Sequence, residues 1–554
     1  MPKHTTAASA PLRVVIITLD NHLTGAVNRL RIQMAREMPG LELSVHAASG
    51  WATNPATLEA CRADIAQGDI IVATMLFMED HIQAVMPALK ARRETCDAMI
   101  CFMSAGEVIK LTRMGRFAMG GSQGTLVNLL KKLRGAKANG AASSASAGEK
   151  QLALLKRIPK ILRFIPGTAQ DLRAYFLAMQ YWLAGSEENI GHLIRFLASR
   201  YADGPRKTYR DGLRYDDPKT YPEVGVYHPR LAGRMSETAD KLPSPPKANR
   251  ATVGLLLMRS YVLSGDTAHY DGVIAAFESR GLKVIPAFAT GLDQRPAIER
   301  FFMRSGTPTI DALVSLSGFS LVGGPAYNDA KAAEDMLARL DVPYIAAQPV
   351  EFQTLEEWET SERGLHPIET TMMIAIPELD GAAGGVVFGG RSIKDQGERG
   401  MRVHAERAAT LAARVLKMVN LRATPKSERK IAVILFNFPP NAGAVGTAAF
   451  LSVFESLHNT LKAMRAEGYT VEVPETAAAL QDRLLKGNAE RFGSDANVVA
   501  RIGVDDHVRR ETWLSEIEAQ WGPAPGRQQA DGSGIQVMGE RFGNVLVGIQ
   551  PAFG

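Results

Sequence analysis

The sequence has few cysteines and no long apolar run. Its three cysteines are Cys61, Cys96 and Cys101, and no two of them form a CxxC pair. Three cysteines are too few for a disulfide framework and fit free thiols in a reducing compartment. No uninterrupted apolar stretch approaches the roughly 20 residues that cross a bilayer, and the N-terminus lacks the apolar core of a signal peptide. We therefore expect a cytoplasmic protein.

Several motifs that bind cofactors or nucleotides are also missing. The chain has no GxxxxGK[ST] motif, whose backbone would cradle nucleotide phosphates, so any dependence on ATP must come from a partner. It has no HExxH or CxxCH motif either, which argues against zincin chemistry and covalent haem. We expect no bound cofactor.

The composition is that of a globular protein with several domains. The 554 residues are 46% apolar and 22% charged, so the chain can bury hydrophobic cores. At roughly 150 residues per domain, this length predicts three or four domains rather than one.

Basic residues are concentrated in one segment. The whole chain carries +6, but residues 110–163 hold twelve Lys or Arg against a single acid, Glu149, and so carry +11. Such a field attracts nucleic acid, an anionic membrane surface, an acidic partner or a substrate carboxylate, and a solvated loop and helix face is the alternative. In and directly beside this basic segment, only Phe117 and Phe164 are aromatic residues that could stack on bases. We therefore expect no nucleic acid, and we keep peripheral association with a membrane as an expectation.

Residues 11–134 alternate short apolar runs with amphipathic stretches. The apolar runs cover residues 12–19, 41–48, 69–77 and 98–104, and the amphipathic stretches cover residues 22–38, 55–66 and 80–93. Strands that are apolar on both faces and separated by helices predict a parallel sheet covered on both sides. The predicted fold class is α/β, with a doubly wound, flavodoxin-like first domain.

A connecting region is predicted after this domain. Residues 135–150 are small and polar, which predicts a flexible linker. Residues 151–248 are predicted to be helical at first, with Tyr181 and Trp182 buried, and then proline-rich. The prolines of residues 216–229 and 241–246 favour extended structure that connects rather than packs.

Two further α/β modules are predicted, over residues 249–425 and 426–554. The first module is expected to have a strand at 252–258, a loop at 259–271, a helix at 272–281 and a strand at 282–288. The second is expected to have a strand at 430–438, a helix at 447–468 and strands at 469–475 and 544–550. Gly281 and Gly468 follow the helices, where a left-handed C-cap is needed. Because no covering helix follows the last strand, we expect the last module to be truncated.

The loop after the first strand of the last module is a candidate site for an anion. Backbone N–H groups and the helix dipole can hold a carboxylate or phosphate there, and Gly443 and Gly446 allow close approach. Asn437 and Asn441 could orient a polar group of the ligand. A tight strand-to-helix connection would use the same residues as turn formers, so both interpretations stay open.

Two pairs of titratable residues are further candidates, the first for proton transfer or metal handling and the second for substrate binding. His366 and Glu369 lie in GLHPIE, where Pro367 suits the first position of a helix and Glu369 falls in its first turn. This pair either faces a cleft as proton acceptors or serves only the helix. Asp266 and His269 follow the first strand of their module, a position suited to a site, although Asp266 could instead be a helix N-cap. No residue is assigned to a metal.

Two other clusters favour structural roles. Cys96 and Cys101, spaced C-x4-C, are predicted to be buried thiols. Asp505, Asp506 and His507 could bind a hard cation, but a charged helix start is the preferred interpretation.

Several segments together resemble the large-subunit family of magnesium chelatase and cobaltochelatase, and most closely its magnesium-chelatase H subunits. In family order they are VVIITLDNHL (14–23), SAGEVIKLTRMGRF (104–117), YPEVGVYHP (221–229), RSYVLSGDTAHYD (259–271), GLHPIETTMMIAIPELDG (364–381) and NFPPNAGAVGTAA (437–449). The N-terminal domain and the His-Pro of GLHPIE resemble the magnesium enzyme more than the cobalt enzyme. Family members are much longer, so the resemblance implies an N-terminal fragment.

The resemblance implies a subunit of an enzyme complex. In that family the large subunit binds protoporphyrin IX, and the complex uses ATP to insert Mg2+, as a substrate, in chlorophyll and bacteriochlorophyll biosynthesis for photosynthesis. The implied partners are AAA+ ATPase subunits I and D, which agrees with the missing phosphate-binding loop. We do not expect the 554 residues to insert the metal by themselves.

Three other functions are left open. A cobaltochelatase homologue would act on a corrin precursor. A non-catalytic tetrapyrrole-binding or assembly module would bind porphyrin or a partner without metal insertion. A nucleotide-sugar or dinucleotide enzyme rests on the doubly wound fold alone.

Overall fold

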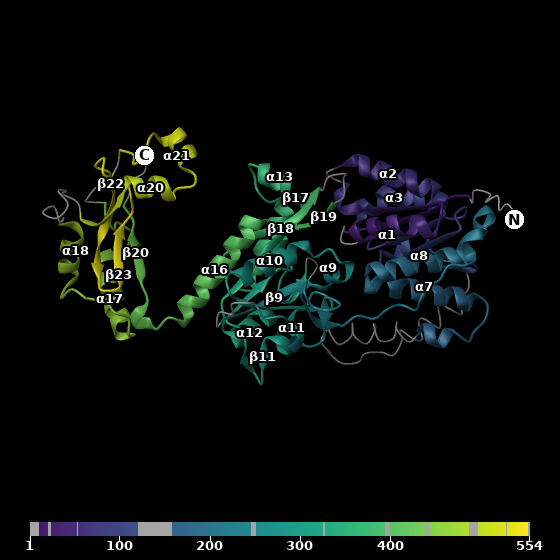
Figure 1. Ribbon diagram of the computed structural model, residues 1–554, viewed down its shortest axis with the longest axis horizontal. Coiled ribbons are helices and arrows are strands. Elements are labelled where there is room, and N and C mark those ends of the chain that lie inside the picture. Colours follow the sequence, from purple (N-terminus) through teal and green to yellow (C-terminus); the bar gives the residue numbers. More distant parts are fainter. Residues whose placement is uncertain are drawn as a thin grey trace, which may run out of the picture. The chain divides into compact units, whose positions relative to one another are not determined.

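The computed structural model describes residues 10–19, 24–51, 54–119, 158–244, 251–324, 327–393, 399–437, 444–486, 497–527 and 529–551. The chain divides into two compact units, Met1–Leu416 and Lys417–Gly554. Figure 1 follows the chain through both units by colour. The predicted linker, residues 135–150, and most of the basic segment 110–163 lie outside the described residues.

The first sheet confirms the flavodoxin-like prediction. Its strands lie in the order β2-β1-β3-β4-β5-β6. The four parallel strands are β1 (Leu12–Thr18), β2 (Leu41–Ala47), β3 (Ile70–Thr74) and β4 (Ala98–Phe102). The two-residue strands β5 (Arg113–Met114) and β6 (Phe117–Ala118) extend the sheet in antiparallel orientation. β3 and β4 are buried along their whole length, as expected of central strands that carry apolar residues on both faces.

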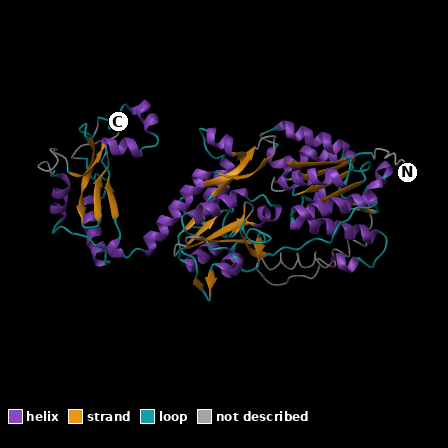
Figure 2. Ribbon diagram, in the orientation of Figure 1, coloured by secondary structure: helices purple, strands orange, loops and turns teal. Residues whose placement is uncertain are grey.

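Helices connect these strands and cover the sheet. They are α1 (Thr24–Glu37), α2 (Pro55–Gln67), α3 (Glu79–Arg92) and the short α4 (Gly106–Ile109). One face of the sheet packs against apolar residues of α2 and α3, among them Ile65 and Leu89. The opposite face packs against α1 through Val27 and Leu30. Figure 2 shows the strands of this sheet between helices.

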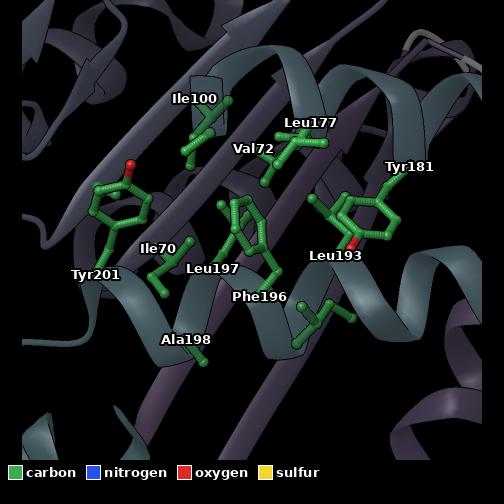
Figure 3. Close-up of a cluster of buried hydrophobic side chains, with 14 of the residues drawn as sticks. Ile70, Val72, Ile100, Leu177, Tyr181, Leu193, Phe196, Leu197, Ala198 and Tyr201 are labelled. Atoms are coloured by element: carbon green, nitrogen blue, oxygen red, sulfur yellow. The ribbon is translucent and has the colours of Figure 1, made fainter. Parts of the chain in front are cut away.

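The second face is completed by two helices from far along the chain, α7 (Thr168–Ala184) and α8 (Glu187–Tyr201). Gly185 takes a positive φ of 57° between them, and Ser186 caps α8 by accepting a hydrogen bond from the backbone N of Asn189 at 3.1 Å. The predicted burial of Tyr181 and Trp182 is confirmed, at 1% and 5% exposure. Figure 3 shows residues of both helices packed on Ile70, Val72 and Ile100 of the sheet.

The second sheet has the strand order β16-β13-β9-β10-β7-β8. Its parallel strands are β9 (Thr252–Met258), β10 (Lys283–Ala289), β13 (Ala312–Ser315) and β16 (Tyr344–Ala346). The antiparallel strands β7 (Val224–Tyr227) and β8 (Met235–Ser236) close one edge. The accompanying helices are α9 (Arg259–Ser264), α10 (Ala268–Ser279), α11 (Arg295–Phe301) and α12 (Ala330–Leu340).

Two expectations for this part of the chain are wrong. The segment 216–229 does not merely connect, because Val224–Tyr227 pairs with β10. Pro222 and Pro229 flank this strand instead of interrupting it, which is where a strand tolerates proline. The segment 259–271 is not a loop throughout, because buried apolar residues form α9, which ends at Gly265 with a positive φ of 74°.

A smaller sheet of β17 (Gln348–Thr354), β18 (Val387–Ile393) and β19 (Arg399–Val403) follows. The nearby helices are α13 (Leu355–Thr360), α14 (Pro367–Thr370), α15 (Ile376–Leu379) and α16 (Ala405–Ala423), with a π-helical turn at Thr371–Ala375. Short hairpins pair β11 (Met303–Arg304) with β12 (Thr307–Pro308) and β14 (Gly323–Gly324) with β15 (Tyr327–Asn328). β19 lies against α10 at Gly272, where an added Cβ would collide with the side chain of Val403.

The second unit contains a mixed sheet in the order β20-β23-β22-β21. Its strands are β20 (Ile431–Leu435), β21 (Val498–Gly503), β22 (Gly534–Phe542) and β23 (Val545–Ile549), and only β20 and β23 pair in parallel among the residues described. The helices are α17 (Val453–Ala466), α18 (Ala477–Leu485), α20 (Val504–Arg510) and α21 (Leu514–Trp521). The sheet buries Leu435, Val547 and Phe542 in a core with α17 and α18.

The predicted return strand at residues 469–475 is wrong, because these described residues form no strand. Thr470 O accepts a hydrogen bond from the backbone N of Asn544 at 2.9 Å, but Pro474 has no N–H with which to continue a ladder. The predicted helix at 447–468 begins only at Val453. The left-handed glycines are confirmed, with φ of 76° at Gly281 and 90° at Gly468.

The three cysteines are buried free thiols, which confirms the prediction for Cys96 and Cys101. Burial raises the pKa of Cys61 and of Cys101 to about 12. None of the helices in the described part of the chain is long and apolar enough to cross a membrane.

We expect Phe102→Ala to lower the free energy of unfolding of the first domain by about 3–5 kcal/mol, because it opens a cavity beneath α7. Phe102 is fully buried, with its ring centroid 6.0 Å from that of Trp182. Urea denaturation followed by tryptophan fluorescence measures the effect. The control is Phe164→Ala, which removes a side chain that is 84% exposed and should change stability by less than about 0.5 kcal/mol. Equal effects of the two substitutions would contradict the packing described.

Candidate functional site

A cluster of buried polar and aromatic side chains lies beyond the carboxyl end of β9, where open α/β sheets place their ligands. Tyr261 comes from α9, and His269 and Tyr270 come from α10. Strands β17 and β18 contribute Glu351 and Arg391. The sequence thus places one side of the cluster directly after a strand of the second sheet, and the small sheet supplies the other side.

His269 is the most deeply buried titratable group of the cluster, with 0% exposure. Its ring centroid lies 3.8 Å from that of Tyr270 and 5.8 Å from that of Phe388, and the edge of Tyr261 is 5.2 Å away. Neither ring nitrogen has a hydrogen-bond partner in the described structure. Burial, and then the nearby charge of Arg391, holds the pKa of His269 well below its ordinary value. The imidazole is therefore neutral at pH 7.

Arg391 and Tyr261 form the charged side of the cluster. Arg391 is 4% exposed, and its Nη2 donates to the Tyr261 hydroxyl at 3.3 Å. Burial, followed by the charge of Glu351, raises the pKa of Tyr261 well above its ordinary value. The phenol therefore stays protonated. Its oxygen accepts a hydrogen bond from the Arg391 guanidinium, and the Glu351 carboxylate lies beside it.

Asp266 reaches the cluster from the turn before α10. Its carboxylate is 8% exposed, and Oδ1 accepts a hydrogen bond from the backbone N of Met401 at 3.0 Å. Oδ2 is buried without a partner in the described structure. The alternative that Asp266 caps the helix is wrong by one residue, because Thr267 is the N-cap of α10.

Glu369 is fully buried, and both of its oxygens are occupied. Oε1 accepts from the backbone N atoms of Glu351 and Phe352, each at 3.0 Å. Oε2 accepts from Gln353 Nε2 at 2.6 Å and from the backbone N of His366 at 3.2 Å. The carboxylate thus fastens β17 to α14, whose first residue is Pro367 as predicted. The side chain of His366 is half-buried at the N-cap of this helix.

Glu351 connects Glu369 of one predicted pair to Tyr261, whose ring contacts His269 of the other pair. Glu351 donates its backbone N–H to Glu369, and its side chain interacts with Tyr261. Glu369 and Tyr261, which are far apart in the sequence, are thus connected across β17, and His269 joins them only through its ring contact with Tyr261. Carboxylates and a neutral imidazole can accept protons, and a buried guanidinium can hold an anionic group. Among the described residues, no group of three or more His, Cys, Asp or Glu side chains is placed to hold a metal ion.

The candidates in the second unit lie after β20. Asn437 is 7% exposed, its backbone N donates to Gln550 Oε1 at 3.3 Å, and its Oδ1 is buried without a partner in the described structure. Gly446 has a positive φ of 69° and donates its N–H to Phe436 O at 2.7 Å. Asn441 and Gly443 lie outside the described residues. An anion-binding role for this loop stays a prediction.

Sequence reasoning missed Tyr261, Glu351 and Arg391. An arginine directly after Gly389 and Gly390 in an otherwise apolar strand was a usable signal, because a strand buries a charge only with a partner. Glu351 gave no such signal. The interpretation of Asp505, Asp506 and His507 as a charged helix start is confirmed, since both aspartates lie in the first turn of α20.

Comparison with known proteins identifies the family. The model of the family described as CobN/Magnesium Chelatase matches residues 179–554, more than half of the chain. The chain belongs to this family. A second family model, a domain of unknown function named DUF3479, matches residues 13–176 of this chelatase-family chain.

Relatives of the chelatase-family chain are much longer than it is. It is 49% identical to the H subunit of magnesium chelatase from Cereibacter sphaeroides over 98% of its own length and 46% of the relative. The corresponding protein of Rhodobacter capsulatus is 48% identical over the same shares. The chain thus spans about half the length of these relatives.

A solved structure shares the fold. The catalytic subunit of cobaltochelatase from Mycobacterium tuberculosis matches with a TM-score of 0.58 and 18% identity, over 97% of this chain and 38% of that one. At this identity the likeness supports the mixed α/β architecture.

We expect the stability of the first unit to fall as the pH drops below about 6.5, the ordinary pKa of histidine. The unfolded chain then binds a proton that native His269 does not, so the free energy of unfolding falls by up to about 1.4 kcal/mol per pH unit. His269→Phe keeps the ring stack and should remove this part of the slope. Denaturant titrations between pH 7.5 and 5.5 measure it.

The control is Phe164→Ala, which removes an exposed side chain that does not titrate and should leave the slope unchanged. His228, whose pKa is also lowered by burial, titrates in all of these proteins and cancels from the comparison. If His269→Phe and the parent protein show the same slope, His269 is not the neutral buried group described.

We expect Glu369→Gln to lower the free energy of unfolding by about 1.5–3 kcal/mol. The substitution replaces one carboxylate oxygen, which accepts two hydrogen bonds, by an NH2 group that would point at the same two donors. Glu378→Gln, at an exposed position of α15, is the control. A neutral outcome for Glu369→Gln in urea denaturation would contradict the four hydrogen bonds given to this carboxylate.

Proposed function

We propose that the chain is the porphyrin-binding part of a magnesium-chelatase H subunit. The complex would insert Mg2+ into protoporphyrin IX with ATP hydrolysis, in bacteriochlorophyll or chlorophyll biosynthesis. The observation that carries this proposal is the 49% identity to the H subunit of a magnesium chelatase over 98% of the chain. Identity at this level over every domain supports a common function and not only a common fold.

The chemistry makes two demands on such a protein. Magnesium gives up its water ligands reluctantly, and the porphyrin must lose two pyrrole protons before the metal can enter. A base for these protons must be unprotonated at working pH. The lowered pKa of His269 keeps it neutral, and His366 is a half-buried imidazole at the predicted position. Glu369 has hydrogen-bond donors on both oxygens, so we assign it the role of positioning β17 and His366.

The two propionates of protoporphyrin need cationic or N–H partners. The buried guanidinium of Arg391, the basic segment 110–163 and the backbone near Asn437 and Gly446 are the candidate groups. A guanidinium on a rigid strand can hold a carboxylate in a fixed orientation. These assignments are proposals for residues in two separate units, and each can be tested by itself.

The energy source and partners belong to the same proposal. The sequence has no phosphate-binding loop, so ATP would be hydrolysed by AAA+ partners corresponding to chelatase subunits I and D. Mg2+ enters as a substrate. Peripheral association with an anionic membrane is supported by the +11 charge of residues 110–163.

A protoporphyrin IX titration followed by quenching of the five tryptophans tests the binding function. We expect saturable quenching, and weaker binding of the dimethyl ester, because the ester lacks the carboxylates that the basic groups attract. Failure of protoporphyrin to bind both this chain and a version extended to the length of its relatives would refute the proposal. Binding only by the extended version would show that the cavity needs further residues.

A second candidate is cobalt insertion into a corrin precursor, favoured by the CobN branch of the matching family. Supplying each metal and macrocycle to the extended chain with its ATPase partners and ATP separates the two. Magnesium porphyrin as the only product supports our proposal, and cobalt corrin supports the alternative. Tight porphyrin binding without either product would indicate a non-catalytic binding module.

A further inference from the structure

An apolar turn directly before α7 protrudes from the first domain. It begins with a short helical segment at residues 158–162. Three neighbouring apolar side chains of this turn are exposed, Ile161 by 62%, Phe164 by 84% and Ile165 by 46%. Contiguous exposed apolar side chains of this kind mark a surface that contacts another molecule. The porphyrin function proposed above does not use them.

The backbone of this turn is fixed to the domain beneath it. Ile158 and Leu162 are buried in the core of the first domain. Gln170 Nε2 of α7 donates to the carbonyl O of Leu162 at 2.9 Å and to that of Ile165 at 2.6 Å. These hydrogen bonds satisfy carbonyl groups where the helical segment ends. The exposed side chains therefore protrude from an ordered backbone.

The chain around this turn carries charge of one sign. Residues 150–170 contain five Lys or Arg and no Asp or Glu. Two of these cations, Lys160 and Arg163, are exposed and alternate with the exposed apolar side chains. The next acid along the chain, Asp171, accepts a hydrogen bond from the Tyr201 hydroxyl at 3.0 Å, and its side chain is only 13% exposed. The turn is therefore apolar and basic together.

An anionic membrane surface fits both properties. Anionic lipids attract Lys and Arg side chains close to the bilayer. Apolar side chains are stabilised when they enter the boundary between the headgroups and the acyl chains. An acidic protein would match the charge, but it would need a preformed pocket to receive Phe164, whereas a bilayer accepts a protruding side chain anywhere on its surface. The combination therefore favours a membrane over an acidic protein.

We propose that the turn of residues 158–165 docks the chain on an anionic lipid bilayer. Its three exposed apolar side chains enter the interface, and Lys160 and Arg163 contact the lipid phosphates. The turn belongs to the part of the chain that the DUF3479 model matches, so this domain supplies the membrane contact. The inference rests on the peripheral membrane association proposed above and is independent of porphyrin binding.

The test is co-sedimentation of the full chain with vesicles of phosphatidylcholine, either alone or mixed with an equal amount of phosphatidylglycerol. We expect binding to be about tenfold or more tighter on the anionic vesicles and to weaken as salt is added, because salt screens the attraction. Equal binding to both vesicles, or no binding to the anionic ones, would show that the inference is wrong. The protoporphyrin titration needs no vesicles, so it separates this failure from a failure of the porphyrin proposal.

The apolar contact is tested with Phe164→Ala. It should weaken binding to the anionic vesicles about tenfold or more, because it removes the most exposed apolar side chain of the turn. The matched control is Phe77→Ala, which removes a 55% exposed phenylalanine close to the acidic residues Glu79 and Asp80 and should have no effect. Unchanged vesicle binding of Phe164→Ala would overturn the proposal, because the basic segment alone would then attract the vesicles.

The basic side chains are tested with the double variant Lys160→Gln and Arg163→Gln. Binding to the anionic vesicles should weaken about fivefold for each charge removed. The control removes two exposed cations elsewhere, with Lys90→Gln and Arg363→Gln, and should have a smaller effect. Equal losses in the two double variants would mean that net charge determines binding, which contradicts docking through this turn.

Insertion is measured with an NBD fluorophore at position 164. Phe164→Cys provides an exposed thiol, whereas the three native cysteines are buried, so the reagent labels the introduced thiol. We expect NBD emission to increase and shift to the blue on anionic vesicles, because the fluorophore leaves water for apolar surroundings. Unchanged emission from vesicle-bound protein would place the turn outside the bilayer and overturn the proposal.

Discussion

A parallel sheet has to be covered by helices on both faces. In the first half of the chain, this requirement determines which helices belong to the domain of the first sheet. Helices α2 and α3 pack on one face of the first sheet, but α1 alone does not cover the other face. α7 and α8 complete it from beyond the basic segment. The two family models meet between residues 176 and 179, inside α7. The boundary between sequence families therefore differs from the boundary of the packed domain.

The second constraint is the cost of burying polar groups. At the edge of β9, Glu369 and Tyr261 are hydrogen-bonded, whereas His269 keeps both ring nitrogens without partners in the described structure. Groups of that kind persist only where the surrounding packing holds them. In unit Met1–Leu416, such atoms also occur on Thr18 and Thr74, the last residues of β1 and β3. In both places the chain leaves a strand of a parallel sheet.

The sequence was sufficient to predict strands, helices and caps wherever the local residue pattern and the burial in the fold agree. The strands of the first sheet and their crossover helices followed from apolar runs and helical periodicity, and Gly281 and Gly468 from the need for left-handed caps. Position alone made Asp266 and His269 candidates, and the structure places both in the cluster beyond β9. Arg391 was signalled only by being a charge in an otherwise apolar strand. Glu351 could not be found, because its contact with Tyr261 across β17 depends on tertiary packing that no local pattern encodes. The strand expected at 469–475 failed for the same reason, since β23 supplies the parallel neighbour of β20.

The cover provided by α7 and α8 has a consequence for proteolysis. Their buried side chains, Tyr181 and Leu193 among them, pack on β3 and β4 through a continuous apolar contact. A single cleavage between residues 120 and 157 would separate the polypeptide into two pieces without removing that contact. The pieces would stay together as a noncovalent complex, and separately expressed halves should reassemble. Fragment complementation, and not loss of the domain, is the outcome this packing favours.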